Sequence, residues 1–439
     1  MKGIKASLFP VEGKPWPPSD ALLSGPLDRL AKRMVIALLK ELRIGQLILE
    51  DRGEQHTFGT PSKAFPLRAC VTVHHGRFYR KALRGGSIGA AEAYMAGDWS
   101  ARNLTHVIRL MVLNRHIFEK MDNRWGRFME PFHQWFHWLH KNTRAGSRAN
   151  ILAHYDLGND FYRLFLDDTM TYSAGIFETE ASTLKEASVA KYDRICLKLD
   201  LQPSDHVLEI GTGWGGFAMH AAKHYGCRVT TTTISPAQFE WAKEGVHRAG
   251  LADRITLLLK DYRDLDGLYD KLVSIEMIEA VGHQFLETFF QCCSRHVRPD
   301  GMMLLQAITI ADGVYESHER SVDFIKRYIF PGSCIPSLAA MCLAVARSTD
   351  LRVVHLEDLT PHYAKTLRAW RQRFFENIEQ VRALGYSDTF VRLWEYYLCY
   401  CEGGFEERYL GNVQMLMTKP FCRSKPILPE LPASLREST

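Results

Sequence analysis

The sequence has no long apolar run, no internal repeat and no low-complexity tract. A helix that crosses a bilayer needs roughly 20 apolar residues in a row, so we expect no membrane-spanning segment. The chain begins with the basic residues Lys2 and Lys5, but the apolar piece that follows is short and leads into prolines, so we expect no signal peptide. At 439 residues the chain is long enough for two or three domains of ordinary globular composition.

Paired cysteines are also absent. The ten cysteines include no CxxC pair, and none combines with histidines at the spacing of a zinc site. We therefore expect no metal. Scattered thiols in a chain of this size are typical of a protein from a reducing cytoplasm.

Acidic residues are scarce in the first third of the chain. Residues 1–150 carry 24 Lys and Arg against 12 Asp and Glu, a net charge of +12, whereas the remainder carries −7. A basic front part on an acidic back part implies an anionic partner for the front, with nucleic acid and anionic lipid as the two candidates.

The segment 123–150 mixes six large aromatic residues with five cations and almost no acids. This composition suits the headgroup level of a membrane, although an interdomain helix with aromatics facing protein is an equal alternative. Stacking on single-stranded nucleic acid is a third reading, but nothing elsewhere indicates an RNA-binding module, so we expect no nucleic-acid partner.

The predicted elements divide the chain into two parts. Residues 27–42 have helical spacing, 68–83 resemble short strands, the stretch "RGGSIG" (84–89) is typical of turns, and two helices follow. From about residue 200, strands and helices alternate regularly. The fold class is therefore α/β, a Rossmann-like doubly wound and mostly parallel sheet, preceded by a smaller α+β N-terminal domain.

The first strand of the alternating part leads into "VLEIGTGWGGFA" (207–218), which satisfies G-x-G-x-x-G. The neighbours of this loop favour S-adenosylmethionine over a dinucleotide. Glu209 would oppose a pyrophosphate but suits the positive charges of this sulfonium donor, and the next strand, "TTTTIS", lacks the acid that binds a dinucleotide ribose.

Nine motifs then occur in order and resemble those of the cyclopropane fatty acid synthases, which include the mycolic acid cyclopropane synthases. The motifs are HYDLGNDFY, MTYSAGIF, VLEIGTGWGGFA, TTISPAQ, KDYRDL, MIEAVG, RYIFPGSCIPS, YAKTLRAW and YYLCYCEGGF. The resemblance implies a class I methyltransferase domain over 151–425 with an acyl-chain insertion near 312–350. The rest of the chain is then expected to form an N-terminal lipid-associating domain (1–120), a linker (121–150) and a tail (426–439).

The resemblance implies transfer of a methyl group from S-adenosylmethionine to the cis double bond of a phospholipid acyl chain, followed by closure to a cyclopropane. The residues that match the family's donor site are Tyr172, Ser173, Glu209, Gly211, Gly213, Gly215, Thr233, Gln238, Asp261 and Tyr262. The alternatives are C-methylation of the chain without ring closure and N-methylation of a small amine.

The family holds a bicarbonate ion as its general base. Its ligands map to the backbone of Ala174 and Ile308 and to the side chains of Glu279, Gln306 and Tyr363. Many members have cysteine at the position of Ala174 and histidine at the positions of Gln306 and Ala280. These departures put the closing deprotonation in doubt. A salt bridge is the non-functional alternative for Glu279.

Two further expectations follow from the resemblance. Cys401 aligns with a cysteine proposed as an active-site residue, although methyl transfer needs no thiol and a packing role is favoured. The segment 321–346 should form an apolar acyl channel. We expect a homodimer in the cytoplasm, bound peripherally to the inner face of the cell membrane through anionic lipid.

Overall fold

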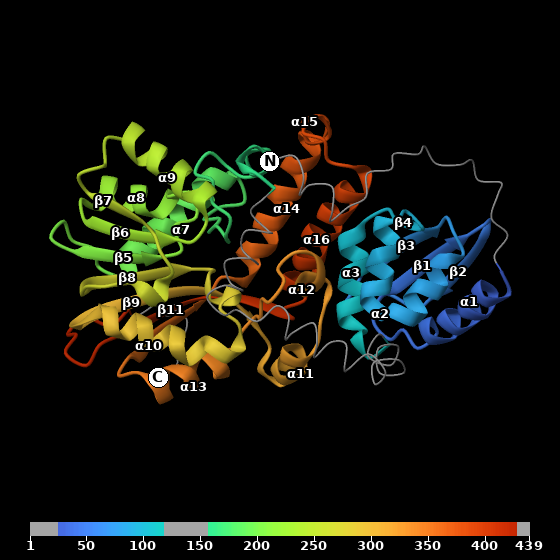
Figure 1. Cartoon of the computed structure of the whole chain (residues 1–439). Helices are drawn as coiled ribbons and strands as arrows, with labels where there is room; N and C mark the ends of the chain where they lie inside the picture. The colour runs from blue at the N-terminus through green and yellow to red at the C-terminus, as the bar shows by residue number, and fades with distance from the viewer. Residues whose placement is uncertain (1–24, 118–156, 428–439) are drawn as a thin grey trace, which may run out of the picture.

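The computed structural model describes residues 25–117 and 157–427. Figure 1 shows a small N-terminal part beside a larger part built on one wide sheet. The segment 123–150, with its predicted membrane or interdomain role, lies outside the described residues, as does most of the tail.

The N-terminal part is a four-stranded sheet covered by helices. Its elements are α1 (Pro26–Leu39), β1 (Gln46–Asp51), β2 (Glu54–Phe58), β3 (Arg68–Val73), α2 (Arg77–Met95), β4 (Trp99–Ala101) and α3 (Leu104–Leu113), with the strand order β2-β1-β3-β4. The prediction of strands throughout 68–83 was wrong beyond Val73. The stretch "RGGSIG" lies inside α2 instead of forming the predicted turn, and Gly86 bends the helix there with a φ of 53°.

The large sheet has the order β10-β11-β9-β8-β5-β6-β7, and only β11 runs antiparallel to its neighbours. Its strands are β5 (His206–Ile210), β6 (Arg228–Thr233), β7 (Ile255–Leu259), β8 (Tyr269–Ile275), β9 (Val297–Ile310), β10 (Arg352–Asp358) and β11 (Leu410–Thr418). The predicted doubly wound, mostly parallel sheet is confirmed.

Helices cover both faces of this sheet. One apolar cluster joins it to α7 (Leu184–Lys198), α8 (Gly216–Tyr225) and α9 (Pro236–Arg248), and a second joins it to α10 (Leu286–His296) and α13 (Leu338–Ser348). The start of α9 is as predicted, since the Ser235 side chain accepts a hydrogen bond from the Gln238 amide and Pro236 occupies the first turn.

The remaining helices belong to neither of these two clusters. They are α6 (Asn159–Arg163), α11 (Tyr315–Arg320), α12 (Phe324–Tyr328), α14 (Thr360–Glu376), α15 (Ile378–Ala383) and α16 (Asp388–Glu406). Helix α16 packs against α2 and α3, and the Thr105 hydroxyl donates to the buried Glu402 carboxylate over 3.1 Å. Figure 1 shows α12 and α16 between the large sheet and the N-terminal helices. Within the described ranges, no helix is both long and apolar enough to cross a membrane.

Candidate active site

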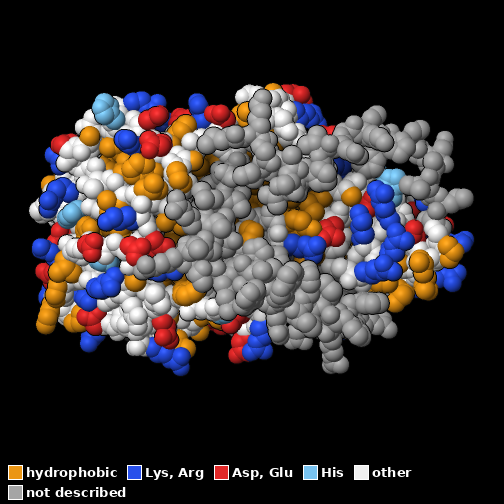
Figure 2. All heavy atoms as spheres, viewed as in Figure 1, with side chains coloured by type: hydrophobic (Ala, Val, Ile, Leu, Met, Phe, Trp, Pro, Cys, Tyr) orange, Lys and Arg blue, Asp and Glu red, His pale blue; other side chains and the backbone are white. Residues whose placement is uncertain are grey.

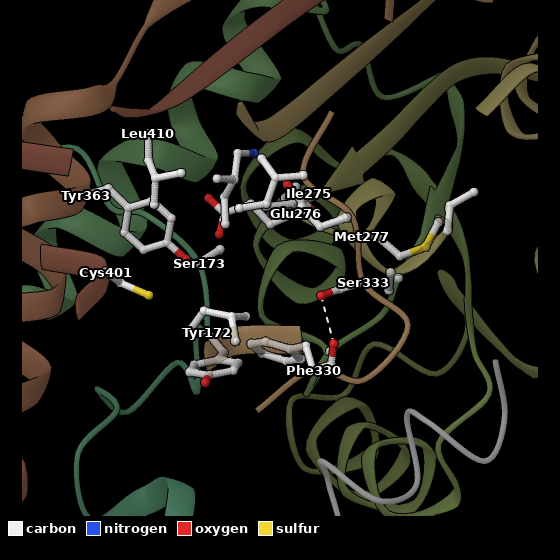
Figure 3. Close-up of a pocket in the computed structure, with 18 of the residues that line it drawn as sticks. Tyr172, Ser173, Ile275, Glu276, Met277, Phe330, Ser333, Tyr363, Cys401 and Leu410 are labelled. Carbon is white, nitrogen blue, oxygen red and sulfur yellow. Dashed lines mark hydrogen bonds between the residues drawn. The ribbon is translucent and has the colours of Figure 1, made fainter. Parts of the chain in front are cut away.

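A cavity of about 500 Å³ lies at the carboxyl ends of β5, β6 and β8, where ligands of open α/β sheets bind. Helices α14 and α16 and the segment around α11 and α12 form its other walls, and Ser87 and Val112 reach it from the N-terminal part. Figure 3 shows Tyr363 and Cys401 on one side of this pocket and Met277 on the opposite side.

The glycine loop forms one end of the cavity. Gly211 and Gly213 line it with φ angles of 103° and 52°, which a side chain would strain. Gly215, expected beside the donor, is not among the lining residues. It is the left-handed N-cap of α8, and its neighbour Gly216 lines the cavity instead.

Two buried ionisable side chains, one acidic and one basic, face this end of the cavity. The Glu209 carboxylate is 2% exposed and accepts a hydrogen bond from Thr231 over 2.6 Å. Burial raises the pKa of Glu209 to about 8, against the Thr231 bond and the positive charge of Lys191. The Lys191 ammonium is 1% exposed and donates to the Ser173 hydroxyl over 2.8 Å, and burial lowers its pKa to about 8. A zwitterionic ligand such as the methionine part of S-adenosylmethionine fits this pair, because its ammonium would favour the charged form of Glu209 and its carboxylate the charged form of Lys191.

The other residues expected at the donor also line the cavity. Thr233 donates to the Gln238 side chain over 2.9 Å. The Asp261 carboxylate is already held by the Arg263 guanidinium at 2.8 and 2.6 Å, and Tyr262 lies beside it. Tyr172 stacks on Trp370 with ring centroids 5.1 Å apart and shares a 2.9 Å hydroxyl contact with Tyr397.

Three of the five groups expected to hold bicarbonate, from Ala174, Gln306 and Tyr363, converge on a carboxylate that sequence reasoning missed. Glu276 Oε1 accepts hydrogen bonds from the Ala174 amide (3.0 Å), from Gln306 Nε2 (2.9 Å) and from Asn412 Nδ2 (2.7 Å). The Tyr363 hydroxyl is also bonded to this side chain, and its pKa is raised first by burial and then by the charge of Glu276.

Glu276 directly follows β8 and has a φ of 48°, an uncommon backbone conformation outside glycine. Such strain is typical of functional sites, where surrounding contacts hold the residue in place. Its position at the carboxyl end of a sheet strand was the available sequence signal. The family motif pointed instead to Glu279, three residues on.

Glu279 lies beside this group but has a different environment. Its Oε1 accepts from the Ile308 amide over 2.5 Å, while its Oε2 is buried without a hydrogen-bond partner among the described residues. Burial, and next the charge of Glu276, raise the pKa of Glu279 to about 8. Glu279 is therefore mainly protonated at neutral pH, and no ion pair within the described ranges includes it.

Cys401 lines the cavity on the α16 side. Burial raises the pKa of its thiol far above the ordinary range, so the nucleophilic thiolate is not populated at neutral pH. This environment favours the packing role.

The segment 321–346 divides between two roles. Val322, Ile325, Phe330 and Ile335 line the cavity, as expected for an acyl channel. Met341, Ala344 and Val345 of α13 pack instead against α10 in the sheet core, so the channel prediction was wrong for that half. The described residues contain no group of three potential metal ligands.

The wide sheet, its order and the cavity at its carboxyl edge define a class I S-adenosylmethionine-dependent methyltransferase. The profile of the mycolic acid cyclopropane synthetase family matches residues 141–415, and the chain belongs to this family.

Two curated relatives span most of the chain. Tuberculostearic acid methyltransferase of Mycobacterium tuberculosis is 36% identical over 423 residues, covering 93% of this chain and 96% of the relative. Cyclopropane-fatty-acyl-phospholipid synthase of Escherichia coli K12 is 34% identical over 363 residues, with coverages of 80% and 88%. The solved structure of mycolic acid cyclopropane synthase CmaA1 with SAH and CTAB has a TM-score of 0.58 and 35% identity, and the match covers 62% of this chain and 98% of that one.

Proposed function

We propose that the enzyme transfers a methyl group from S-adenosylmethionine to the cis double bond of an unsaturated phospholipid acyl chain, with Glu276 as the general base. The observation that carries this proposal is the Glu276 carboxylate, held by converging donors inside a largely apolar cavity next to the glycine loop. Family membership and the names of the two curated relatives support a lipid acceptor.

The chain's own residues orient the donor. Gly211 and Gly213 let the backbone approach its methionine part, and Glu209 and Lys191 pair with its ammonium and carboxylate. Thr233, Gln238, Asp261 and Tyr262 border the ribose and adenine. When bound, the donor supplies one electrophilic methyl group to the alkene.

Proton removal falls to Glu276. The alkene's π electrons form the new carbon–carbon bond while the sulfur–methyl bond breaks toward sulfur, which leaves a cation on the acyl chain. The transferred methyl group then gives a proton to Glu276. An ion held by the same donors is not needed, so we propose Glu276 in place of the bicarbonate first expected.

We propose a methylene-branched product. Similarity to the tuberculostearic acid methyltransferase over most of both chains supports a product without ring closure. In this route a hydride on the methyl-bearing carbon shifts to the neighbouring cation. Loss of a methyl proton then gives an exocyclic double bond. Ring closure, in which that proton leaves before the shift, is the second candidate and is favoured by similarity to the E. coli synthase.

The test uses purified enzyme, methyl-labelled S-adenosylmethionine and vesicles of unsaturated phospholipid. Label in the acyl chains is expected. Label confined to headgroups, or transfer only to soluble amines, would overturn the proposal and favour an N-methyltransferase. Vesicles of fully saturated phospholipid are the matched control and should take up no label.

We also propose peripheral membrane binding and a homodimer, as first expected. The positive charge of the N-terminal part supports binding to a membrane with anionic lipid, since residues 25–117 hold 15 Lys and Arg against 7 Asp and Glu. Figure 2 shows Lys and Arg side chains gathered over this part on the visible face. Flotation with vesicles containing anionic lipid, compared with neutral vesicles, measures the first property, and sedimentation equilibrium measures the second.

A further inference from the structure

A row of polar side chains crosses the strands β9, β11 and β10 of the large sheet. Gln306 of β9 is the register partner of Gln414 of β11, which is in turn the partner of Glu357 of β10. Gln306 and Gln414 are both 0% exposed. Buried amides are costly unless every polar atom is satisfied, so this row needs a physical reason.

Hydrogen bonds connect the row from the outer strand to the base. Lys198 Nζ donates to Gln414 Oε1 over 2.8 Å, Gln414 Nε2 donates to Gln306 Oε1 over 3.0 Å, and Gln306 Nε2 donates to Glu276. Lys198 itself is held by Glu357 at 2.6 Å.

The ammonium at the start fixes the direction of every bond. Lysine offers only donors when charged, so the oxygen of the Gln414 amide must face Lys198. The nitrogen of Gln414 then faces the oxygen of Gln306, which turns the nitrogen of Gln306 toward Glu276. The nitrogen of Gln306 also donates to the Ala174 carbonyl over 3.3 Å, so the acceptors at this end of the row hold the same orientation as the ammonium at the other.

The Glu357 carboxylate keeps Lys198 charged. Although burial opposes its ionisation, hydrogen bonds from Arg194 and Lys198 lower the pKa of Glu357 to about 2. Burial lowers the pKa of Lys198, and the bond to Glu357 counters that effect.

We infer that Lys198 and Gln414 are positioning residues that act through Gln306 to hold the Glu276 carboxylate in place and oriented for proton removal. The inference rests on the proposed role of Glu276 as base. The other titratable groups around Glu276 are Tyr363, Glu279 and Lys191, and none of them forms part of the row.

The test is the pH dependence of kcat in Lys198→Met and Gln414→Met. Each change removes a donor from the row and leaves a buried amide oxygen without a partner, so Gln306 is held less firmly and its hydrogen bond to the Glu276 carboxylate weakens. The acid limb of the kcat–pH profile should move to a pH about one unit higher. At pH values below the limb, turnover should be about tenfold lower than in the native enzyme, and at pH values above the limb it should be nearly the same. Affinity for SAH should be unchanged, which also reports a folded donor site.

Arg194→Met is the matched control. Arg194 lies one turn before Lys198 on α7 and binds the same Glu357 carboxylate without touching Gln414, so its profile should stay in place. Lys198→Arg keeps a cationic donor and should restore the native limb. A uniform loss of turnover with an unmoved limb, or an equal shift in Arg194→Met, would overturn the inference.

Glu276→Gln separates this inference from the proposed function. If Glu276→Gln keeps full turnover, the assignment of the base fails, and the positioning role fails with it. If Glu276→Gln is inactive while Lys198→Met and Gln414→Met keep the native limb, only the positioning role fails.

Discussion

The backbone amide of Ala174 donates a 3.0 Å hydrogen bond to the carboxylate of Glu276, a residue 102 positions later in the chain. This bond brings the loop after α6 to the carboxyl end of β8, beside the apolar cavity. The alanine at this position, which lacks the cysteine side chain of many family members, still presents the amide that the site uses.

Glu276→Gly should lower the rate of methyl transfer at neutral pH at least about a hundredfold, because general-base catalysis typically contributes a factor of 10² to 10⁴ in rate. Affinity for SAH should remain within about threefold, measured by calorimetry. Removing the side chain leaves the donors of Ala174, Gln306 and Asn412 unfilled, so added bicarbonate should restore part of the activity. The activity of the native enzyme should not depend on bicarbonate. Loss of that activity on removal of carbon dioxide would contradict the assignment of Glu276 as the base.

Glu279→Gln should keep most of its turnover at pH 7, within about fivefold, since glutamine mimics a protonated glutamate that accepts from Ile308. This contrast with Glu276→Gln is measured by initial rates at matched donor concentration. A loss as large as that in Glu276→Gln would mean that Glu279 acts as a charged group.

Glu279 should also make the free energy of unfolding depend on pH. The pKa of Glu279 is about 8 in the folded protein, above its ordinary value of 4.5, so the folded state binds the proton more tightly. Its effect on stability is therefore constant below pH 4.5 and turns unfavourable as pH rises from there toward 8. The Tm advantage of Glu279→Gln over the native chain should be larger at pH 8.5 than at pH 6, and an equal difference at both would contradict the raised pKa.

Lys191→Met should weaken binding of SAH by roughly 10- to 100-fold, because a charged hydrogen bond of about 1.5–3 kcal/mol to the ligand carboxylate is lost. Binding of the decarboxylated analogue of SAH should change far less. Calorimetry on both ligands measures the difference, and an equal loss for both would assign Lys191 a purely structural role.

Cys401→Ala should retain turnover within about threefold, since a protonated buried thiol acts through packing. Alkylating reagents should modify the native thiol slowly. A complete loss in Cys401→Ala with an unchanged Tm would restore a chemical role to this residue.

Local pattern was sufficient to predict the large sheet and the glycine loop, because alternating strands and helices and the Ser235 cap are encoded over a few residues. It failed over residues 77–89, where short strands and a turn were expected and the structure has a helix that Gly86 bends. The choice between a turn and a kinked helix depends on packing of α2 that no short window contains.

The base site was only half predictable for a similar reason. The motifs identified the donors at Ala174, Gln306 and Tyr363, but the group they surround is the first residue after β8. Asn412, 136 positions after Glu276, completes the site from the antiparallel strand. The departure at Gln306 becomes intelligible through Gln414, its cross-strand partner 108 positions away.

The most direct test of the account is the reaction of S-adenosylmethionine carrying a fully deuterated methyl group with vesicles of a monounsaturated phospholipid, followed by mass spectrometry and proton NMR of the acyl chains. The account predicts a branched chain that keeps two of the three deuterons at an exocyclic double bond, the third having gone to Glu276. Two deuterons in a cyclopropane ring would be consistent with Glu276 as the base but would contradict the branched product. Three deuterons retained on the acyl chain, or label on nitrogen, would contradict proton removal by Glu276.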